Sequence, residues 1–195
     1  MKQPAGVILA GGLATRMGGG DKCLLPLGGA PMLAGIVARL QPQVAELALN
    51  ANGDASRFAG FDLPVVRDSV DGFAGPLAGV LAGLDWAAQA GHESIVTAAG
   101  DTPFFPQDLV ARLMAACAGM AHPLALACTP DGRQPTFGLW PVALREDLRA
   151  ALTGGLRKVV LWTDRHGGQM AEFPETLAFF NINTPDELAQ AEAML

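Results

Sequence analysis

Runs of continuous apolar residues alternate along this chain with segments whose apolar residues recur at helical spacing. Residues 5–10 form an unbroken apolar run, and within residues 31–40 the side chains of Leu33, Ile36 and Leu40 fall on one helical face. Strands buried on both faces have continuous apolar sequences, and their alternation with helices is typical of a mostly parallel sheet. The sequence therefore predicts an α/β fold of three layers, α/β/α, with a mostly parallel central sheet.

The predicted elements extend through the whole chain. Strands are expected at residues 5–10, 44–50, 64–67, 94–99, 124–129, 135–140, 170–173 and 179–182. Helices are expected at residues 31–40, 77–90, 106–117, 142–152, 156–162 and 185–195, with a helical turn at 56–59. A turn at residues 130–132 joins two of the strands, which predicts a late antiparallel portion of the sheet. Thr184 and Pro185 favour the cap and first turn of the last helix. Because no linker interrupts the pattern, residues 1–195 are expected to form a single domain.

Composition excludes several classes of function. Half of the 195 residues are hydrophobic, only 16% are charged, and the net charge is −6. Nucleic-acid affinity depends on neutralising phosphates with Lys and Arg, so an acidic chain without a basic run is not expected to bind DNA or RNA. No apolar run approaches the ~20 residues of a membrane span. The three cysteines lack metal-site spacing, and no signal-peptide pattern follows Met1, so a cytoplasmic protein is expected.

A glycine-rich stretch with two cationic side chains, Arg16 and Lys22, follows the first predicted strand. Glycines let backbone N–H groups approach a ligand closely, and successive N–H groups form a concavity that binds anions. The stretch is not a P-loop, because Asp21 precedes the lysine and Cys23 follows it. It is too rich in glycine to open a helix as a dinucleotide fingerprint does. The pattern indicates a phosphate-binding loop, and a turn with incidental charges is the alternative.

Polar residues follow five of the predicted strands. In an open α/β sheet, ligands bind beyond the carboxyl ends of the strands. Asp101 comes directly after a buried strand, where a carboxylate can hold Mg²⁺ together with substrate phosphates; a turn-forming Asp is the alternative. Asp68 could contact a ribose or metal, or cap a loop. Asn50 could bind a base edge or end a strand, and Asn183 could complete the site or mark the start of a helix.

The remaining polar residues point to no hydrolytic machinery. Arg157 and Lys158 form a small basic spot that could bind a phosphate, or could be the solvated start of a helix. The histidines lie in separate predicted loops, and no G-x-S-x-G or Cys/His pattern is present. Phosphoryl chemistry needs no such nucleophile, because it relies on positioning and charge stabilisation.

Six motifs in this order give the chain a resemblance to a known family. It resembles the molybdenum cofactor guanylyltransferases, within the nucleotidyltransferases that have a Rossmann-like core. The resemblance covers almost the whole chain and is carried by Leu9-Ala10-Gly11-Gly12 with Arg16-Met17-Gly18 and Asp21-Lys22, Asn50-Ala51-Asn52, Asp68-Ser69, Gly75-Pro76-Leu77-Ala78-Gly79, Asp101-Thr102-Pro103, and Asn181-Ile182-Asn183-Thr184-Pro185.

The resemblance implies a role for each matching residue. GTP would be bound by Leu9, Ala10, Gly11, Lys22, Asn50, Asp68 and Asp101. Asp101 would also hold Mg²⁺, and the catalytic residues would be Arg16, Lys22 and Asp101. The edge of the site that receives the pterin substrate would be formed by Arg157, Lys158, Asn181 and Asn183. The nucleotide would occupy the half formed by residues 1 to about 105, and the pterin the half from about 106 to 195.

The implied reaction transfers GMP from GTP to the terminal phosphate of Mo-molybdopterin, which gives molybdopterin guanine dinucleotide and pyrophosphate. Transient contacts with proteins that supply or accept the cofactor are also expected. A cytidylyltransferase for the same pterin is one alternative; Gly11 favours GTP, because the cytosine enzymes have Leu-Ala-Ala-Gly. A sugar-1-phosphate nucleotidyltransferase and a non-catalytic GTP- or cofactor-binding module are the others.

Overall fold

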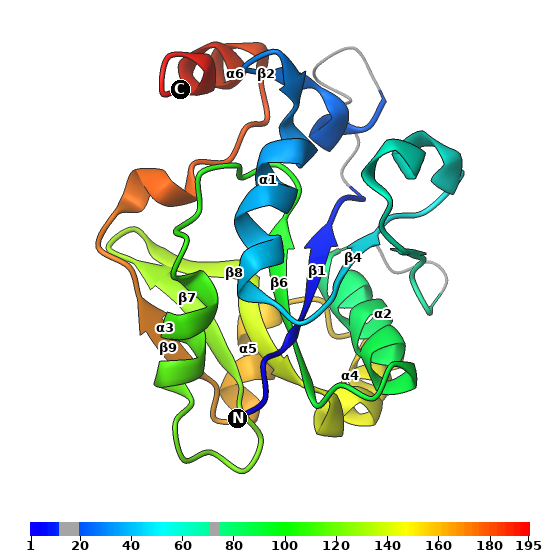
Figure 1. Ribbon diagram of the computed structural model, residues 1–195. Coiled ribbons are helices and arrows are strands. Elements are labelled where there is room, and N and C mark those ends of the chain that lie inside the picture. Colours follow the sequence, from blue (N-terminus) through cyan, green and yellow to red (C-terminus); the bar gives the residue numbers. More distant parts are fainter. Residues whose placement is uncertain (12–19, 71–74) are drawn as a thin grey trace.

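A seven-stranded sheet forms the centre of the computed structural model, which describes residues 1–11, 20–70 and 75–195. Its strand order is β5-β4-β1-β6-β8-β7-β9 (Figure 1). The strands are β1 (Ala5–Leu9), β4 (Leu47–Asn50), β5 (Val65–Val66), β6 (Ser94–Ala99), β7 (Ala125–Thr129), β8 (Gly132–Pro141) and β9 (Gln169–Glu172). A separate hairpin consists of β2 (Pro26–Leu27) and β3 (Ala30–Pro31).

The helices lie between and after these strands. They are α1 (Met32–Leu40), α2 (Pro76–Gln89), α3 (Leu109–Ala116), α4 (Arg145–Thr153), α5 (Val159–Arg165) and α6 (Pro185–Glu192). Short 3₁₀ segments are η2 (Lys22–Leu24), η3 (Gln41–Gln43), η4 (Ala55–Phe61), η5 (Val142–Leu144) and η6 (Thr176–Phe179). None of the helices in the described part of the chain has the length and hydrophobicity that a membrane crossing requires.

The sheet is mostly parallel, as the sequence predicts. β1 pairs in parallel with β4 and β6, β4 with β5, and β7 with β9. β8 runs antiparallel to both of its neighbours, β6 and β7, which confirms the late antiparallel portion. From β1 the chain first adds β4 and β5 on one side and then β6 on the other. The strand order therefore reverses between β1 and β6, and such a switch point is where α/β sheets bind ligands.

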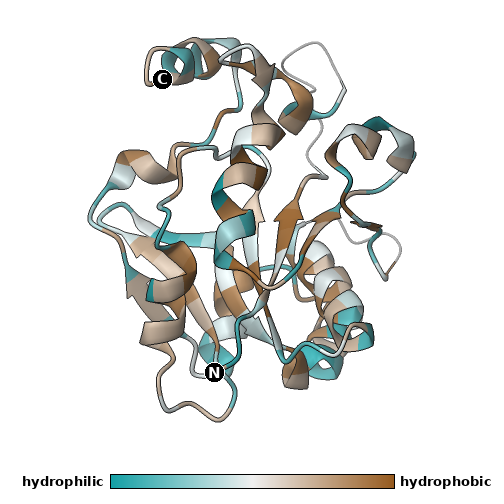
Figure 2. Ribbon diagram, in the orientation of Figure 1, coloured by the Kyte–Doolittle hydropathy of each residue, from teal (hydrophilic) through white to brown (hydrophobic). Residues whose placement is uncertain are grey.

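Two apolar cores lie on opposite faces of the sheet, which confirms the three layers. Alternate residues of β1 serve each core: Ile8 packs with α1 and α3, and Val7 packs with α2 and the tryptophans Trp140 and Trp162. Successive side chains of a strand point to opposite faces, so an unbroken apolar run can fill both cores. Figure 2 shows the most hydrophobic colouring along the central strands.

The predicted strand at residues 179–182 is wrong. Phe179 ends the 3₁₀ segment η6, and the following residues extend across the ends of the strands instead of pairing along the sheet. The apolar residues of this segment are buried all the same, because Phe179 packs edge-on against Phe137 and Phe173. The backbone N–H of Ile182 donates to the carbonyl of Asp101 over 2.9 Å, which fixes the segment beside the end of β6.

Several other boundaries also differ from the prediction. The helices expected from residues 106, 142 and 156 begin at Leu109, Arg145 and Val159. A turn, the 3₁₀ segment η5 and an irregular stretch precede them, respectively. The last helix begins as expected: Pro185 is its first residue, and the Thr184 side chain accepts a hydrogen bond from the backbone N–H of Glu187.

Candidate active site

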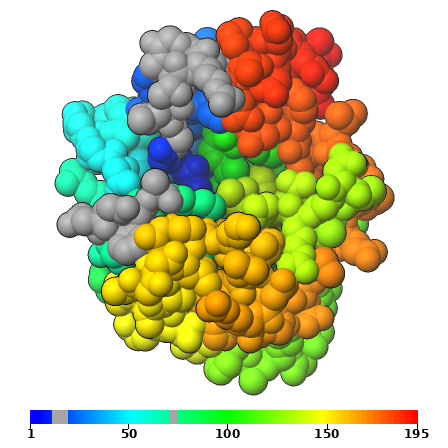
Figure 3. Space-filling model, turned by 180° about the vertical axis from the view of Figure 1, so that it is seen from behind, coloured from blue at the N-terminus to red at the C-terminus, as the bar shows by residue number. Residues whose placement is uncertain are grey.

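A cavity of about 430 Å³ lies at the carboxyl ends of β1, β4 and β6, at the switch point of the sheet. It is lined by Leu9, Gly11, Asn50, Asn52, Asp68, Gly75, Pro76, Ala99, Asp101, Thr136 and Asn181. In Figure 3 the dark blue start of the chain is visible at the bottom of a hollow that cyan and green segments border. Polar side chains from separate strand ends therefore converge on one cavity, as the sequence predicts.

A buried lysine lies beside this cavity, in contact with Asp101, which lines it. Lys22 Nζ donates to Asp101 Oδ2 and to Asn183 Oδ1, both over 2.6 Å. Only 11% of the lysine side chain and 22% of the aspartate side chain are exposed. Burying a charge is costly unless it is paired and hydrogen-bonded, so these contacts account for the burial of the ammonium group. We call Lys22, Asp101 and Asn183 the lysine cluster.

The position of Asp101 depends on the glycine before it. β6 is buried along its whole length, and Gly100 turns the chain across the end of β1. A side chain at Gly100 would place Cβ 3.0 Å from the carbonyl oxygen of Leu9 and 3.1 Å from Cα of Ala10. Glycine therefore permits the close approach that brings the Asp101 carboxylate to the opening of the cavity.

Asn183 is held in place by the start of α6. Its backbone N–H donates to Glu187 Oε2 over 2.7 Å, while the N–H of Glu187 donates to the Thr184 hydroxyl. The hydrogen bond from Asn183 is the largest cause that lowers the pKa of Glu187. The side chains of Thr184 and Glu187 thus accept hydrogen bonds from backbone N–H groups at the start of α6, in the manner of a capping box. These contacts orient the Asn183 amide toward Lys22.

Two asparagines and an aspartate occupy the opposite side of the cavity. Asn50 Nδ2 donates to Asp68 Oδ1 over 2.9 Å, and Asn52 Nδ2 donates to Asp68 Oδ2 over 2.8 Å. The backbone N–H of Asp68 donates in return to Asn52 Oδ1. Asn50 ends β4 and Asp68 follows β5, so sheet pairing brings them together. We call Asn50, Asn52 and Asp68 the amide–carboxylate cluster.

Helix α2 approaches this cluster through a glycine. A Cβ at Gly79 would overlap the Asn50 side-chain oxygen and would lie 2.8 Å from Cδ2 of Leu9. Pro76 is the first residue of the same helix and lines the cavity with Gly75. The first turns of α2 therefore form a wall that is packed directly against the amide–carboxylate cluster.

Eight of the residues predicted for the site lie in or against the cavity. Six line it: Leu9, Gly11, Asn50, Asp68, Asp101 and Asn181. Lys22 and Asn183 reach it through the lysine cluster. Ala10 is buried behind the lining, and its backbone N–H donates to the carbonyl of Asn50. Arg16 lies outside the described residues.

The basic pair predicted for the pterin edge is not brought to this cavity. Arg157 and Lys158 are exposed just before α5, and neither lines the cavity. The Arg157 guanidinium donates to the carbonyls of Leu152 and Leu156, among its contacts. These contacts are those expected of the alternative interpretation, the solvated start of a helix.

Sequence reasoning missed four residues around the cavity. Asn52 had no assigned role, although it repeats the amide of Asn50 two residues later, on the same side of an extended chain. Glu187 has a signal in the sequence, because Thr-x-x-Glu at a helix start is typical of a capping box. Thr136 on β8 and Arg57 on η4 carry no such signal, since only the folded chain brings them near.

Two observations limit the chemistry of the site. Burial is the largest cause that raises the pKa of the Cys23 thiol to about 12, so this cysteine next to Lys22 is not a thiolate nucleophile. Within residues 1–11, 20–70 and 75–195, no group of three or more His, Cys, Asp or Glu side chains could hold a metal ion. The site does offer the Asp101 carboxylate and amide oxygens. This set fits Mg²⁺, which is commonly bound by one or two carboxylates plus substrate phosphates.

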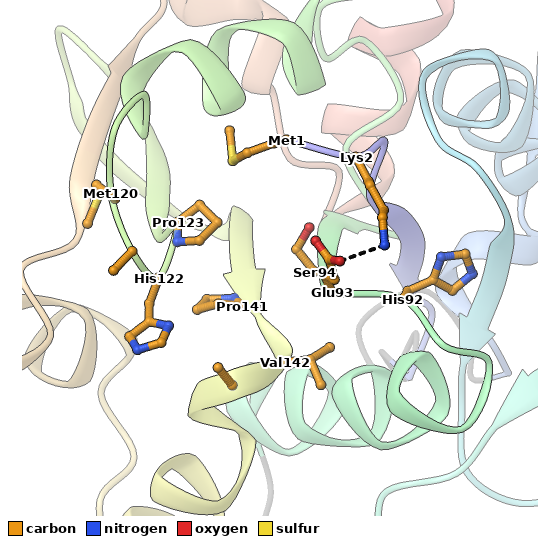
Figure 4. A pocket seen from close by; sticks show the side chains of 12 residues that line it. Met1, Lys2, His92, Glu93, Ser94, Met120, His122, Pro123, Pro141 and Val142 are labelled. Atoms are coloured by element: carbon orange, nitrogen blue, oxygen red, sulfur yellow. Dashed lines mark hydrogen bonds and ion pairs between the residues drawn. The ribbon is translucent and has the colours of Figure 1, made fainter.

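A second cavity, of about 490 Å³, lies at the opposite edge of the sheet (Figure 4). Its walls come from residues before β1, at the start of β6, before β7 and at the end of the antiparallel strand β8, and this is the edge at which the parallel strands begin. An ion pair of 2.6 Å between Lys2 and Glu93 lies within it. None of the residues predicted for the site lines this cavity, so it is separate from the candidate active site.

Comparison with known proteins shows which family the chain belongs to. Residues 6–167 match the protein family described as "MobA-like NTP transferase domain". A molybdenum cofactor guanylyltransferase from Mesorhizobium japonicum is 51% identical over 198 residues, covering 98% of this chain and 95% of that protein. One from Cereibacter sphaeroides is 52% identical over 190 residues, covering 97% and 96%.

The fold agrees with a solved structure as well. Molybdopterin-guanine dinucleotide biosynthesis protein A from Archaeoglobus fulgidus superimposes with a TM-score of 0.78 over 97% of each chain, at 22% sequence identity. The structural match shows the shared fold, and the identities near 50% over almost the full length show the family. The chain belongs to the molybdenum cofactor guanylyltransferases, which are nucleotidyltransferases of the MobA-like family.

Proposed function

We propose that this protein transfers GMP from GTP to the terminal phosphate of Mo-molybdopterin, with Mg²⁺, and releases pyrophosphate. The observation that carries the proposal is the convergence of the two clusters on one cavity: Asn50 and Asp68 line one side, and Asp101, paired with Lys22, lines the other. Membership in a family whose relatives are named guanylyltransferases supports the choice of guanine.

The nucleotide lies across the cavity in this proposal. Its guanosine end faces the amide–carboxylate cluster, where amides donate and a carboxylate accepts hydrogen bonds. Its phosphates face Lys22 and the backbone that follows β1 at Leu9, Ala10 and Gly11, and Arg16 adds a second cation. Ammonium and backbone N–H groups bind phosphate oxygens through charge-assisted hydrogen bonds, which are stronger than neutral ones.

The proposed reaction needs no general base. A terminal phosphate oxygen of the pterin is already ionised and attacks the α-phosphorus of GTP. A new P–O bond forms, the bond from the α-phosphorus to the bridging oxygen breaks, and pyrophosphate leaves with the bonding electrons. Lys22 is placed to balance the charge on the departing pyrophosphate. Asp101 would hold Mg²⁺ with phosphate oxygens, and the metal would stabilise negative charge on the phosphates when bound.

The pterin approaches from the half of the chain after residue 105 in this proposal. Thr136 and Asn181 line that side of the cavity, and Asn183 lies beside it. Arg157 and Lys158 remain candidates for the pterin phosphate. The proposal includes a cytoplasmic location, for which the free thiols of the three cysteines are suited, and transient contacts with proteins that supply or accept the cofactor.

Release of pyrophosphate tests the proposal. Purified protein is incubated with Mo-molybdopterin and Mg²⁺, and turnover with GTP is compared with turnover with CTP. A buried polar group left unpaired by the wrong base costs about 1–3 kcal/mol, so GTP is expected to react roughly 5- to 150-fold faster. Faster turnover with CTP would make the protein a cytidylyltransferase. Binding of GTP without pyrophosphate release would make it a carrier, and release with a sugar 1-phosphate in place of the pterin would change the acceptor.

A further inference from the structure

One side chain outside the cavity connects the segments that carry the two clusters. Arg57 is on η4, and its Nε lies 2.5 Å from Oδ2 of Asp21, the residue before Lys22. Its Nη2 donates to the carbonyl of Asn52 over 2.6 Å, and its Nη1 donates to the carbonyl of Asp54. The guanidinium thus contacts the segment of the lysine cluster through Asp21 and the segment of the amide–carboxylate cluster through Asn52. In the proposed function these clusters bind the phosphates and the base, respectively.

The guanidinium is held from several directions. Its Cζ lies 4.7 Å from the centroid of the Phe58 ring, and Phe58 is buried in the core. The side chain of Arg57 is 27% exposed and that of Asp21 is 12% exposed, so the ion pair is largely shielded from solvent. The two Nη atoms of Arg57 donate to backbone carbonyls, while its Nε faces the Asp21 carboxylate as an ion pair without hydrogen-bond geometry. A lysine ammonium on a flexible stem does not reproduce this planar arrangement.

The segments on either side of this connection are fixed to the clusters. Asn52 is bonded to Asp68 through both its Nδ2 and its Oδ1, so a shift of its backbone carries the amide–carboxylate cluster with it. Asp21 is the residue before η2, whose first residue is Lys22, and the backbone N–H of Leu24 donates to the Asp21 carbonyl. The spacing between the two clusters is therefore set in part by the side chain of Arg57.

We propose that Arg57 is a positioning residue that sets the distance between the base-binding and phosphate-binding sides of the cavity. The inference rests on the proposed function, because it assumes that one nucleoside triphosphate spans both sides. Arg57 does not line the cavity and makes no contact with the nucleotide in this proposal. Its effect is confined to ligands that bind both sides at once, since misplacement of one side lowers the affinity of a ligand that must fit both.

The test compares a complete nucleotide with its two parts. Arg57→Lys, Asp21→Asn and the double variant are titrated with GTP, with guanosine and with tripolyphosphate, by displacement of a fluorescent GTP analogue and without the pterin. GTP is expected to bind about tenfold more weakly to Arg57→Lys, as a misplaced binding group predicts. Guanosine and tripolyphosphate are expected to bind within about twofold of the wild type. The double variant is expected to be no weaker than the single ones, because residues in direct contact are not additive.

Arg112 offers a matched control on the far side of the molecule. It pairs with Asp108 over 2.7 Å, donates to the carbonyl of Glu172, and lies over the buried ring of Phe173. Arg112→Lys removes the same kinds of contact, and GTP affinity is expected to stay unchanged.

The outcomes distinguish failure of the positioning role of Arg57 from failure of the proposed function. Normal GTP affinity in Arg57→Lys overturns the positioning role while the proposed function stands. An equal loss for tripolyphosphate or for guanosine alone also overturns it, because Arg57 would then act on one side only. Failure of the wild-type protein to bind GTP would instead contradict the proposed function.

Discussion

The two clusters of the cavity are assembled in different ways. The amide–carboxylate cluster joins residues only 16 and 18 positions apart, at or just after the ends of the neighbouring strands β4 and β5. The lysine cluster joins residues 79 and 161 positions apart, and one of them, Asn183, comes from the last part of the chain. The first cluster depends on local sheet pairing, whereas the second depends on closure of the whole chain. Mutations should therefore affect binding of the base and chemistry at the phosphates separately.

The largest effect is expected from Asp101→Asn. The substitution removes the carboxylate that pairs with Lys22 and that we propose for Mg²⁺, so turnover should fall by about 10³-fold, as for loss of a group that stabilises transition-state charge. Pyrophosphate release measures turnover, and circular dichroism checks that the fold is kept. Asp108→Asn, at an exposed residue just before α3, serves as the control. A rate near that of the wild type would remove Asp101 from the reaction.

The next largest effect is expected from Lys22→Met, which keeps the length of the side chain and removes its charge. A hydrogen bond between charged groups contributes about 1.5–3 kcal/mol, so tripolyphosphate and GTP should both bind roughly 10- to 100-fold more weakly. Displacement titration measures both affinities. Lys2→Met breaks a pair of the same 2.6 Å length at the other edge of the sheet and should change neither. Unchanged tripolyphosphate affinity in Lys22→Met would show that the lysine holds the site together without binding phosphate.

Asp68→Asn should act on the other cluster alone. The new amide has one oxygen acceptor instead of two, so Asn50 and Asn52 can no longer both donate to separate oxygens. The preference for GTP over CTP should therefore fall by about tenfold. Tripolyphosphate affinity should stay the same, because Lys22 and Asp101 are untouched. The ratio of the two nucleotide affinities measures the effect. Equal weakening of tripolyphosphate would show that the two sides are not independent.

The smallest effect is expected from Glu187→Gln. The pKa of Glu187 is lowered from its ordinary value of 4.5, chiefly by the hydrogen bond from the Asn183 backbone. A carboxylate with a lowered pKa stabilises the folded protein above the pKa of the unfolded chain, and this contribution is lost as the pH falls through the folded pKa. The variant should therefore melt slightly below the wild type at pH 7, and the difference should shrink below about pH 4. Melting curves at both pH values measure it; a constant difference would contradict the role of the charge.

The sequence predicts the sheet better than it predicts the surface segments that close the cavity. The continuous apolar runs at β1 and β6 need two covered faces, and that requirement alone predicts the parallel centre of the sheet. Residues 179–182 have a similar apolar character but extend across strand ends, because Phe179 is buried against two other phenylalanines there. An apolar sequence predicts burial in both cases. It does not distinguish a strand that pairs within the sheet from a segment that packs across the strand ends.

The same limit applies to the candidate site. Asn50, Asp68 and Asp101 could be predicted because each lies at or just after the end of a strand whose direction is known from the pattern. The pairing of Lys22 with Asn183 could not, since it depends on where the last segment of the chain lies after folding. Arg57 was missed for a related reason: its partners are two backbone carbonyls and a distant carboxylate, which leave no pattern in the sequence.

Substitutions at Gly79 should affect nucleotide selectivity, although no nucleotide needs to touch this residue. Helix α2 has room for only a hydrogen atom where it meets Asn50, so even alanine there would push the amide or the helix aside. A library of variants screened for loss of nucleotide selectivity should therefore return substitutions at this buried helical position, alongside those in the polar lining. The protein should remain folded in these variants, with the lysine cluster intact.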